Sequence, residues 1–138
     1  MRQPRGIRNN NPLNIRIGNN WLGECAVKCD PAFEEFTQMR YGIRAAAIIL
    51  RRYILKYHRT TIREIISSWA PESDSNNTVA YVRTVSHRMQ YPDNGHIDAD
   101  NEKQMCNLIE AMAFVECGGS YVSMTDIQDG FRLALSRN

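Results

Sequence analysis

The sequence has little that would mark a membrane protein or a nucleic-acid-binding protein. Its longest apolar stretch, residues 45–50, is too short to span a bilayer. The charges nearly balance, because 17 Lys and Arg residues stand against 15 Asp and Glu residues and leave a net charge of +2. A dedicated nucleic-acid-binding domain usually has a strong basic excess. We therefore expect no membrane insertion and no nucleic-acid partner.

The motifs of several common enzyme classes are also missing. The chain contains no glycine-rich phosphate loop, no HExxH sequence and no GxSxG sequence. The sequence therefore gives little support to an assignment as a kinase, dehydrogenase, metalloprotease or serine hydrolase. The three histidines, His58, His87 and His96, are far apart in the sequence, and we expect each of them on the surface. No metal and no cofactor is implied.

The four cysteines do not have the spacing of a zinc site. Cys25 and Cys29 are four residues apart, and Cys106 and Cys117 are eleven apart. We expect free, buried thiols, and a disulfide between Cys117 and a loop cysteine stays the alternative. The first residues carry charges but no apolar run behind them, which predicts that there is no signal peptide.

The length of the chain fits one domain, residues 1–138, and its patterns predict a mostly α fold of the α+β class. The N-terminal part is rich in turn formers, and the short runs 15–17 and 33–36 predict a small antiparallel β-ribbon. Beyond it, apolar residues recur at three- and four-residue steps, which predicts helices. The expected helices, about five, span 39–57, 61–69, 78–89, 100–117 and 123–135. The expected N-terminal caps are the capping-box pairs Thr61 with Glu64 and Ser123 with Asp126, and single caps at Asn77 and Asp100.

Glu116 is the carboxylate that the sequence singles out. It is the penultimate residue of a strongly apolar predicted helix that ends at Gly118 and Gly119. Partial burial would raise its pKa, as a general acid at neutral pH requires, and the negative end of the helix dipole acts in the same direction. A solvent-exposed glutamate at a helix end is the plainer interpretation, and the pattern alone leaves both open.

Amide and aromatic side chains are dense in the irregular segments. Amides exchange hydrogen bonds with sugar hydroxyls, and aromatic rings pack on sugar faces. Turns and helix caps also use asparagine, so this interpretation competes with a structural one. We expect Trp69, which precedes Ala-Pro, in the core. The candidate sugar contacts are Asn10, Asn11, Asn14, Trp21, Asn76, Asn77 and Tyr81.

Six short segments follow one another in the chain: RGIRNNNPLNIR (5–16), NWLG (20–23), FEEF (33–36), YGIRA (41–45), WAP (69–71) and NNTVAY (76–81). In this order they resemble a small phage- and prophage-associated family that is placed with lysozyme-like proteins and thought to act on peptidoglycan. The resemblance extends over most of the chain, from about residue 5 to residue 120. It implies a lysozyme-like domain that binds peptidoglycan glycan strands.

Residues 111–123 resemble the catalytic-glutamate helix of lytic transglycosylases, which implies that Glu116 is the catalytic acid. In those enzymes this helix comes early in the chain, whereas here it comes late. We therefore hypothesise a circularly permuted lysozyme-like domain in which the Glu116 helix faces the 9–36 ribbon across a sugar-binding cleft. That hypothesis requires the two ends of the chain to lie close together.

The sequence departs from the family pattern at several positions. Leu13 stands where glycine is usual, and Arg40 stands where glutamate is frequent. Ser75 occupies a position that usually holds glutamate, in a loop with one extra residue. If that loop glutamate is the family's catalytic acid, Asp74 is the residue that could replace it.

The resemblance implies cleavage of the β-1,4 bond between N-acetylmuramic acid and N-acetylglucosamine. A lytic transglycosylase needs one protein carboxyl, whereas hydrolysis usually needs two. A hydrolytic muramidase with Glu24, Glu34 or Glu35 as the second carboxylate stays open. So does a non-catalytic phage or secretion-apparatus component that binds glycan or other structural proteins. In each case the protein would be made in the cytoplasm and delivered to the cell wall or periplasm by phage lysis or secretion machinery.

Overall fold

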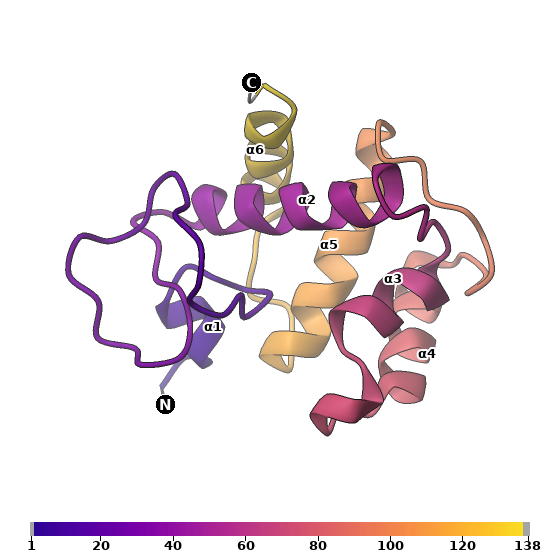
Figure 1. The fold of residues 1–138 in the computed structure, drawn as a ribbon, viewed down its shortest axis with the longest axis horizontal. Helices are drawn as coiled ribbons and strands as arrows, with labels where there is room; N and C mark the ends of the chain where they lie inside the picture. Colours follow the sequence, from indigo (N-terminus) through magenta and orange to yellow (C-terminus); the bar gives the residue numbers. More distant parts are fainter. Residues whose placement is uncertain (1, 137–138) are drawn as a thin grey trace.

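Helices dominate residues 2–136, the part of the chain that the computed structural model describes (Figure 1). The prediction of a mostly α protein is confirmed, with one short N-terminal helix that the sequence patterns did not predict. No helix in the described part is long and apolar enough to cross a bilayer. The elements are α1 (Arg5–Arg8), α2 (Met39–Leu55), α3 (Ile62–Trp69), the 3₁₀ turn η1 (Glu72–Asp74), α4 (Thr78–Met89), α5 (Glu102–Cys117) and α6 (Met124–Leu135).

The helix starts follow the capping signals closely. Thr61 and Glu64 form a reciprocal capping box at α3, and the Ser123 side chain accepts from the backbone N–H of Asp126 at α6. At α5 the cap is Asn101 and not the expected Asp100. Both residues are good caps, and the helix begins one position later than predicted. Gly118, in the left-handed conformation with φ 70°, ends α5 as expected.

The predicted β-ribbon is wrong, since residues 2–136 contain no β-strand. The two runs pair only through one isolated antiparallel bridge, Arg16 with Phe33, and Phe36 forms a second isolated bridge with Glu24, which lies outside both runs. The carboxylate of Asp30 accepts hydrogen bonds from the backbone N–H groups of Ala32 and Phe33, at 2.9 and 3.0 Å. These bonds hold the segment in a turn, so the pairing cannot extend along the chain.

The core is built around α2, whose buried face packs mainly on α6. Gly130 of α6 lies against Ile43, and a side chain at residue 130 would overlap Ile43. Gly42 of α2 allows a similarly close contact with the N-terminal segment, because a Cβ there would overlap the carbonyl group of Asn10. These two glycines let α6 and the N-terminal segment approach the same helix.

The irregular N-terminal segment, residues 9–38, lies on one side of the C-terminal end of α5, and α3 and α4 lie on the other (Figure 1). Buried Leu13 and Phe36 fix this segment to the core. The backbone N–H of Phe36 also donates to the carbonyl of Asn9 at 2.9 Å. The end of α5 therefore sits between two parts of the molecule that are far apart in the sequence.

The arrangement of the helices contradicts the circular-permutation hypothesis. Figure 1 shows α1 and the C-terminal end of α6 on opposite sides of the molecule. The hypothesis required the first and last parts of the chain to lie together, so we abandon it.

The histidine prediction is confirmed, since His58, His87 and His96 are all exposed. The four cysteines are free thiols. Cys106 and Cys117 are buried as expected, but Cys25 is only half-buried and Cys29 is exposed. The two exceptions belong to the irregular segment, where few side chains can cover them.

Candidate functional site

Glu116 lies in the last turn of α5, and its carboxylate is held by two side chains from distant parts of the chain. The Asn14 amide donates to Glu116 Oε1 at 3.0 Å, and the Tyr81 hydroxyl donates to Glu116 Oε2 at 2.9 Å. Asn14 comes from the irregular segment and Tyr81 from α4. The N-terminal segment, α4 and α5 must therefore all be folded before this carboxylate is positioned.

The surroundings of Glu116 favour its protonated form. Burial raises the pKa of the Glu116 carboxyl above its ordinary value, although hydrogen bonds from Asn14, Tyr81 and Trp69 act in the opposite direction. All three donors are neutral groups. A carboxyl with a raised pKa and no cationic partner keeps its proton to a higher pH than an ordinary glutamate does, which is the direction that a general acid requires.

Two hollows meet at Glu116. One has a volume of about 700 Å³ and lies between the N-terminal segment and the loop after α3. The other, of about 330 Å³, runs along α4. Asn76 and Glu116 line both hollows, so we treat them as one groove, the Glu116 groove, with the carboxyl at its middle. The other lining residues are Leu13, Asn14, Arg16, Phe33, Trp69, Ala70, Asp74 and Ser75 on the first side and Asn77, Ala80, Tyr81, Thr84 and Val115 on the second.

The loop between α3 and α4 forms one wall of the groove and is fixed at both ends. The Thr78 hydroxyl donates to the carbonyl of Ala70 at 2.5 Å, and the Asn76 amide donates to the carbonyl of Pro71 at 3.1 Å. Ser75, at the tip, has a left-handed backbone with φ 64°. This geometry turns the chain from η1 into α4 beside Glu116.

Four of the predicted sugar contacts, Asn14, Asn76, Asn77 and Tyr81, line the groove. All four have partners within the protein, and Asn14 and Asn76 bind Glu116 and the Pro71 carbonyl as described above. The Asn77 side chain caps α4 by accepting from the backbone N–H of Ala80. Tyr81 is only 7% exposed and its hydroxyl is bound to Glu116, so its place is beneath the carboxylate and not against a sugar.

The other three predicted contacts do not line the groove. Asn11 is fully buried, and its amide bonds to the backbone of Ile15 and Glu34. Asn10, with φ 52°, donates to the carbonyl of Phe36 at 3.0 Å. Trp21 packs against the core. The amides of Asn10 and Asn11 tie the irregular segment together where no strand ladder does.

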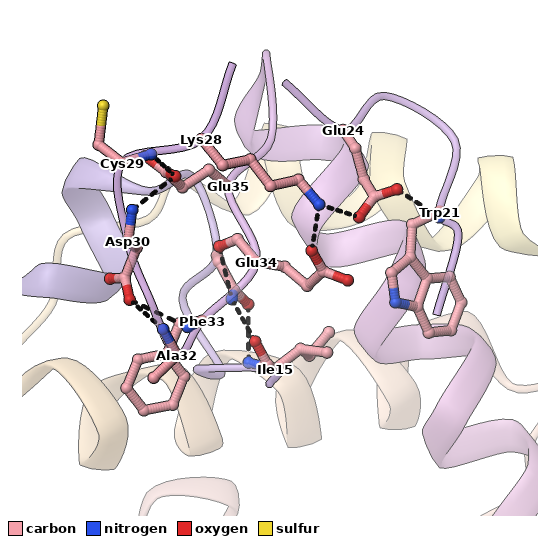
Figure 2. Close-up of polar contacts among 11 residues, drawn as sticks. Ile15, Trp21, Glu24, Lys28, Cys29, Asp30, Ala32, Phe33, Glu34 and Glu35 are labelled. Atoms are coloured by element: carbon pink, nitrogen blue, oxygen red, sulfur yellow. Dashed lines mark hydrogen bonds and ion pairs between the residues drawn. The ribbon is translucent and has the colours of Figure 1, made fainter. Parts of the chain in front are cut away.

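The glutamates expected as a second carboxylate are also engaged elsewhere (Figure 2). The Lys28 ammonium binds Glu24 at 2.7 Å and Glu34 at 2.8 Å, and the Glu34 side chain is fully buried. Glu35 accepts from the backbone N–H groups of Cys29 and Asp30, at 2.6 and 2.9 Å. None of the three lines the groove, so the muramidase interpretation loses the partners assigned to it.

Sequence reasoning missed several residues of the groove. Trp69 was expected in the core but is half-buried, and it packs edge-to-face on Tyr53 with 6.4 Å between ring centroids. Arg16 and Phe33 line the groove through their bridge pairing, which only the alternation in the run 15–17 could have suggested. Asp74, the residue that the sequence suggests as a replacement for the loop glutamate, is the carboxylate besides Glu116 among the described residues that line the groove.

Comparison with known proteins gives a phage relative. No family model matches the chain. Protein P5 of Pseudoalteromonas phage PM2 is 40% identical over 131 residues, which cover 92% of this chain and 79% of P5. The phage association expected from the sequence is thereby confirmed. The identity and the coverage of both chains show that this protein belongs to the family of protein P5 of phage PM2.

Proposed function

We propose that this protein is a peptidoglycan lytic transglycosylase with a lysozyme-like fold, and that Glu116 is its catalytic acid. The observation that carries the proposal is a partly buried carboxyl, held by neutral donors, at the middle of a groove open on both sides of it. A glycan strand laid along this groove would have sugars on each side of the carboxyl, as cleavage inside a polymer requires.

In the first step, Glu116 donates its proton to the oxygen that bridges the two sugars. The bond between C1 of N-acetylmuramic acid and this oxygen breaks, and the departing N-acetylglucosamine leaves with a neutral 4-hydroxyl. The raised pKa of Glu116 keeps the proton available for this transfer. General acid catalysis of this kind contributes about 10²–10⁴-fold to a rate.

In the second step, the Glu116 carboxylate removes the proton from the 6-hydroxyl of the muramoyl residue. The 6-oxygen bonds to C1 and closes an internal anhydro ring, so the carboxyl is protonated again and no water is consumed. Asn14 and Tyr81 stabilise the carboxylate between the steps, since each donates to one of its oxygens. One protein carboxyl is sufficient for this sequence of steps.

Hydrolysis is the second candidate function, and Asp74 is the observation that favours it. Retaining and inverting glycosidases both use a pair of carboxyl groups. Asp74 lines the same groove as Glu116 and lies on the loop between α3 and α4. As a nucleophile or a base for water, it would lead to a reducing end in place of the anhydro ring.

Digestion of purified sacculi tests these proposals directly. We expect soluble muropeptides that end in anhydro-muramic acid, identified by mass spectrometry. Reducing ends that disappear in the Asp74→Asn variant would instead establish the hydrolase. A protein that pulls down sacculi but releases no fragment would be a glycan-binding component, and the enzymatic proposal would be lost.

The Glu116→Gln variant tests the acid itself, because glutamine keeps the shape of the side chain but holds no acidic proton. We expect it to remain folded and to release no fragments above background. Glu110→Gln is the matched control, since Glu110 lies on the same helix and pairs with Arg88 outside the groove. The control should digest sacculi at the rate of the unchanged protein.

A further inference from the structure

Arg16 is placed in the Glu116 groove by its bridge partner. Hydrogen bonds from Ile17 N–H to the Ala32 carbonyl and from Glu34 N–H to the Ile15 carbonyl, both 3.0 Å, flank the pair of Arg16 and Phe33. In such a non-hydrogen-bonded antiparallel pair the two side chains lie on the same face and close together. The Arg16 guanidinium accordingly lies 4.9 Å from the centre of the Phe33 ring.

A second arginine contacts the same ring but is neutralised. The Arg5 guanidinium lies 4.5 Å from the Phe33 ring centre and binds both carboxylate oxygens of Asp30, at 2.6 and 2.5 Å. Arg16 has no ion pair within residues 2–136, and its side chain is exposed. Stacking on Phe33 fixes the orientation of the planar Arg16 guanidinium, while its N–H groups remain available to a ligand.

On this side of the groove, Arg16 lies with two acidic side chains, Glu116 and Asp74. Glu116 forms the middle of the groove, and Asp74 lies on the loop between α3 and α4. No ion pair joins Asp74 to Arg16 in the described structure. Arg16 therefore presents a cation to whatever occupies this part of the groove. The planar guanidinium fork binds a carboxylate through two parallel hydrogen bonds.

We propose that Arg16, stacked on Phe33, binds a carboxylate of the glycan on this side of the scissile bond. The preferred substrate is then a carboxylated glycan and not a neutral polymer of N-acetylglucosamine. This inference rests on the proposed function, because it assigns a subsite in the same groove. In peptidoglycan the carboxylate has two alternative sources. One is the free lactyl group of a muramic acid without a peptide, and the other is the peptide stem, which is attached through an amide of that same lactyl group.

Binding of defined tetrasaccharides by the Glu116→Gln variant tests the subsite, because this variant would bind without cleaving. Isothermal titration calorimetry at low salt would compare three ligands. They are a neutral N-acetylglucosamine tetramer, a muramoyl-containing tetramer with free lactyl carboxylates, and the same tetramer with peptide stems. We expect both carboxylated ligands to bind about tenfold more tightly than the neutral one, which corresponds to one charge-assisted pair.

Adding Arg16→Gln to this variant should remove the preference. The carboxylated ligands should lose about tenfold in affinity and the neutral ligand less than twofold. Loss restricted to the ligand with free lactyl groups would assign the carboxylate to muramic acid, and loss restricted to the peptide-bearing ligand would assign it to the stem. Loss with both would show that either carboxylate can occupy the subsite, because the lactyl carboxyl of the second ligand is amide-bonded to its peptide. Arg16→Lys keeps the charge without the planar fork, so it should recover part of the affinity.

Arg83→Gln is the matched control for the loss of one positive charge. Arg83 is exposed on α4 and lines a separate cavity of about 590 Å³ between α3 and α4. Its replacement should change the affinity of no ligand. An equal loss in the Arg83 and Arg16 variants, or an Arg16 effect shared by the neutral ligand, would overturn the subsite.

The two proposals fail in different ways. If sacculi are cleaved but Arg16→Gln leaves the ligand preference unchanged, the subsite is wrong and the enzymatic function stands. If none of the tetramers binds and sacculi are not cleaved, the groove is not a glycan site, and both proposals are overturned.

Discussion

Two glutamates of this protein, the half-buried Glu116 and the fully buried Glu34, have similar chemistry and different surroundings. Burial raises the pKa of both carboxyl groups. Each also accepts a hydrogen bond from a side chain that favours its charged form. The shift in pKa therefore does not distinguish a candidate catalytic acid from a structural group.

Their partners and their access to solvent do distinguish them. The Glu34 side chain is fully buried and binds the Lys28 ammonium, which also binds Glu24 (Figure 2). Glu116 receives only neutral donors and faces a groove. A buried carboxyl paired with a cation stabilises a loop and is out of reach of a ligand, whereas a groove-facing carboxyl without a cation can exchange its proton with a ligand.

The largest expected effect separates the two glutamates by activity. Glu116→Gln should lower the rate of sacculus digestion by about 10³-fold, because the proton donor is lost. Glu34→Gln should change the rate per folded molecule by less than about threefold, since this carboxyl does not contact the groove. Release of muropeptides measures both rates. Equal losses in the two variants would show that Glu116 and Glu34 do not differ in their importance for activity.

The next effect concerns stability and the Glu34 cluster. Lys28→Met should destabilise the protein by about 1–2 kcal/mol at pH 7, because it leaves a buried carboxylate without its cation. The loss should be smaller at pH 4, where Glu34 is protonated and needs no cation. Urea unfolding at the two pH values measures the difference. A loss independent of pH would indicate that Lys28 acts through packing alone.

A third prediction concerns the pH dependence of activity and the Tyr81 hydroxyl. The hydrogen bond from Tyr81 lowers the pKa of Glu116, so Tyr81→Phe should raise that pKa further. Activity falls as the pH rises through the pKa of the general acid, and this alkaline limb should move to higher pH in the variant. The maximal rate should fall by about tenfold, because the carboxylate loses a stabilising donor. A limb that moves to lower pH would contradict the assignment.

The smallest effect is a gain in stability. The raised pKa means that the folded protein binds the Glu116 proton more tightly than the unfolded chain does. The carboxyl therefore favours folding at low pH, and this contribution is lost as the pH rises through the folded-state pKa. Glu116→Gln should then stabilise the protein by roughly 1 kcal/mol at pH 8 and by much less at pH 4. Thermal unfolding at both pH values measures this, and a destabilised variant at pH 8 would contradict it.

Local rules were sufficient for most of the helices. The capping box at Thr61, the Asn77 cap and the left-handed Gly118 all act within one turn of the chain, so their sequence signals were reliable. The ribbon failed for the opposite reason. Its two runs are joined by a turn that Asp30 stabilises through side-chain bonds, and alternation alone does not reveal such bonds.

The site was predictable only in part, for a similar reason. An apolar helix that ends in Glu116 can be seen in the sequence. The predicted sugar contacts included both Asn14, which binds Glu116, and Asn11, which is fully buried. These two asparagines are three residues apart in one turn-rich segment, so composition could not separate them. Their different tasks depend on which way the folded segment turns each side chain.

The sequence by itself determined a mostly helical domain, the ends of its helices, and a glutamate at the end of an apolar one, because these features depend on neighbours within a few residues. Only the tertiary structure decided which groups meet that glutamate. Asn14 reaches it across 102 residues of chain and Tyr81 across 35. Such contacts are fixed by the packing of α4, α5 and the N-terminal segment against one core, and no local pattern encodes them.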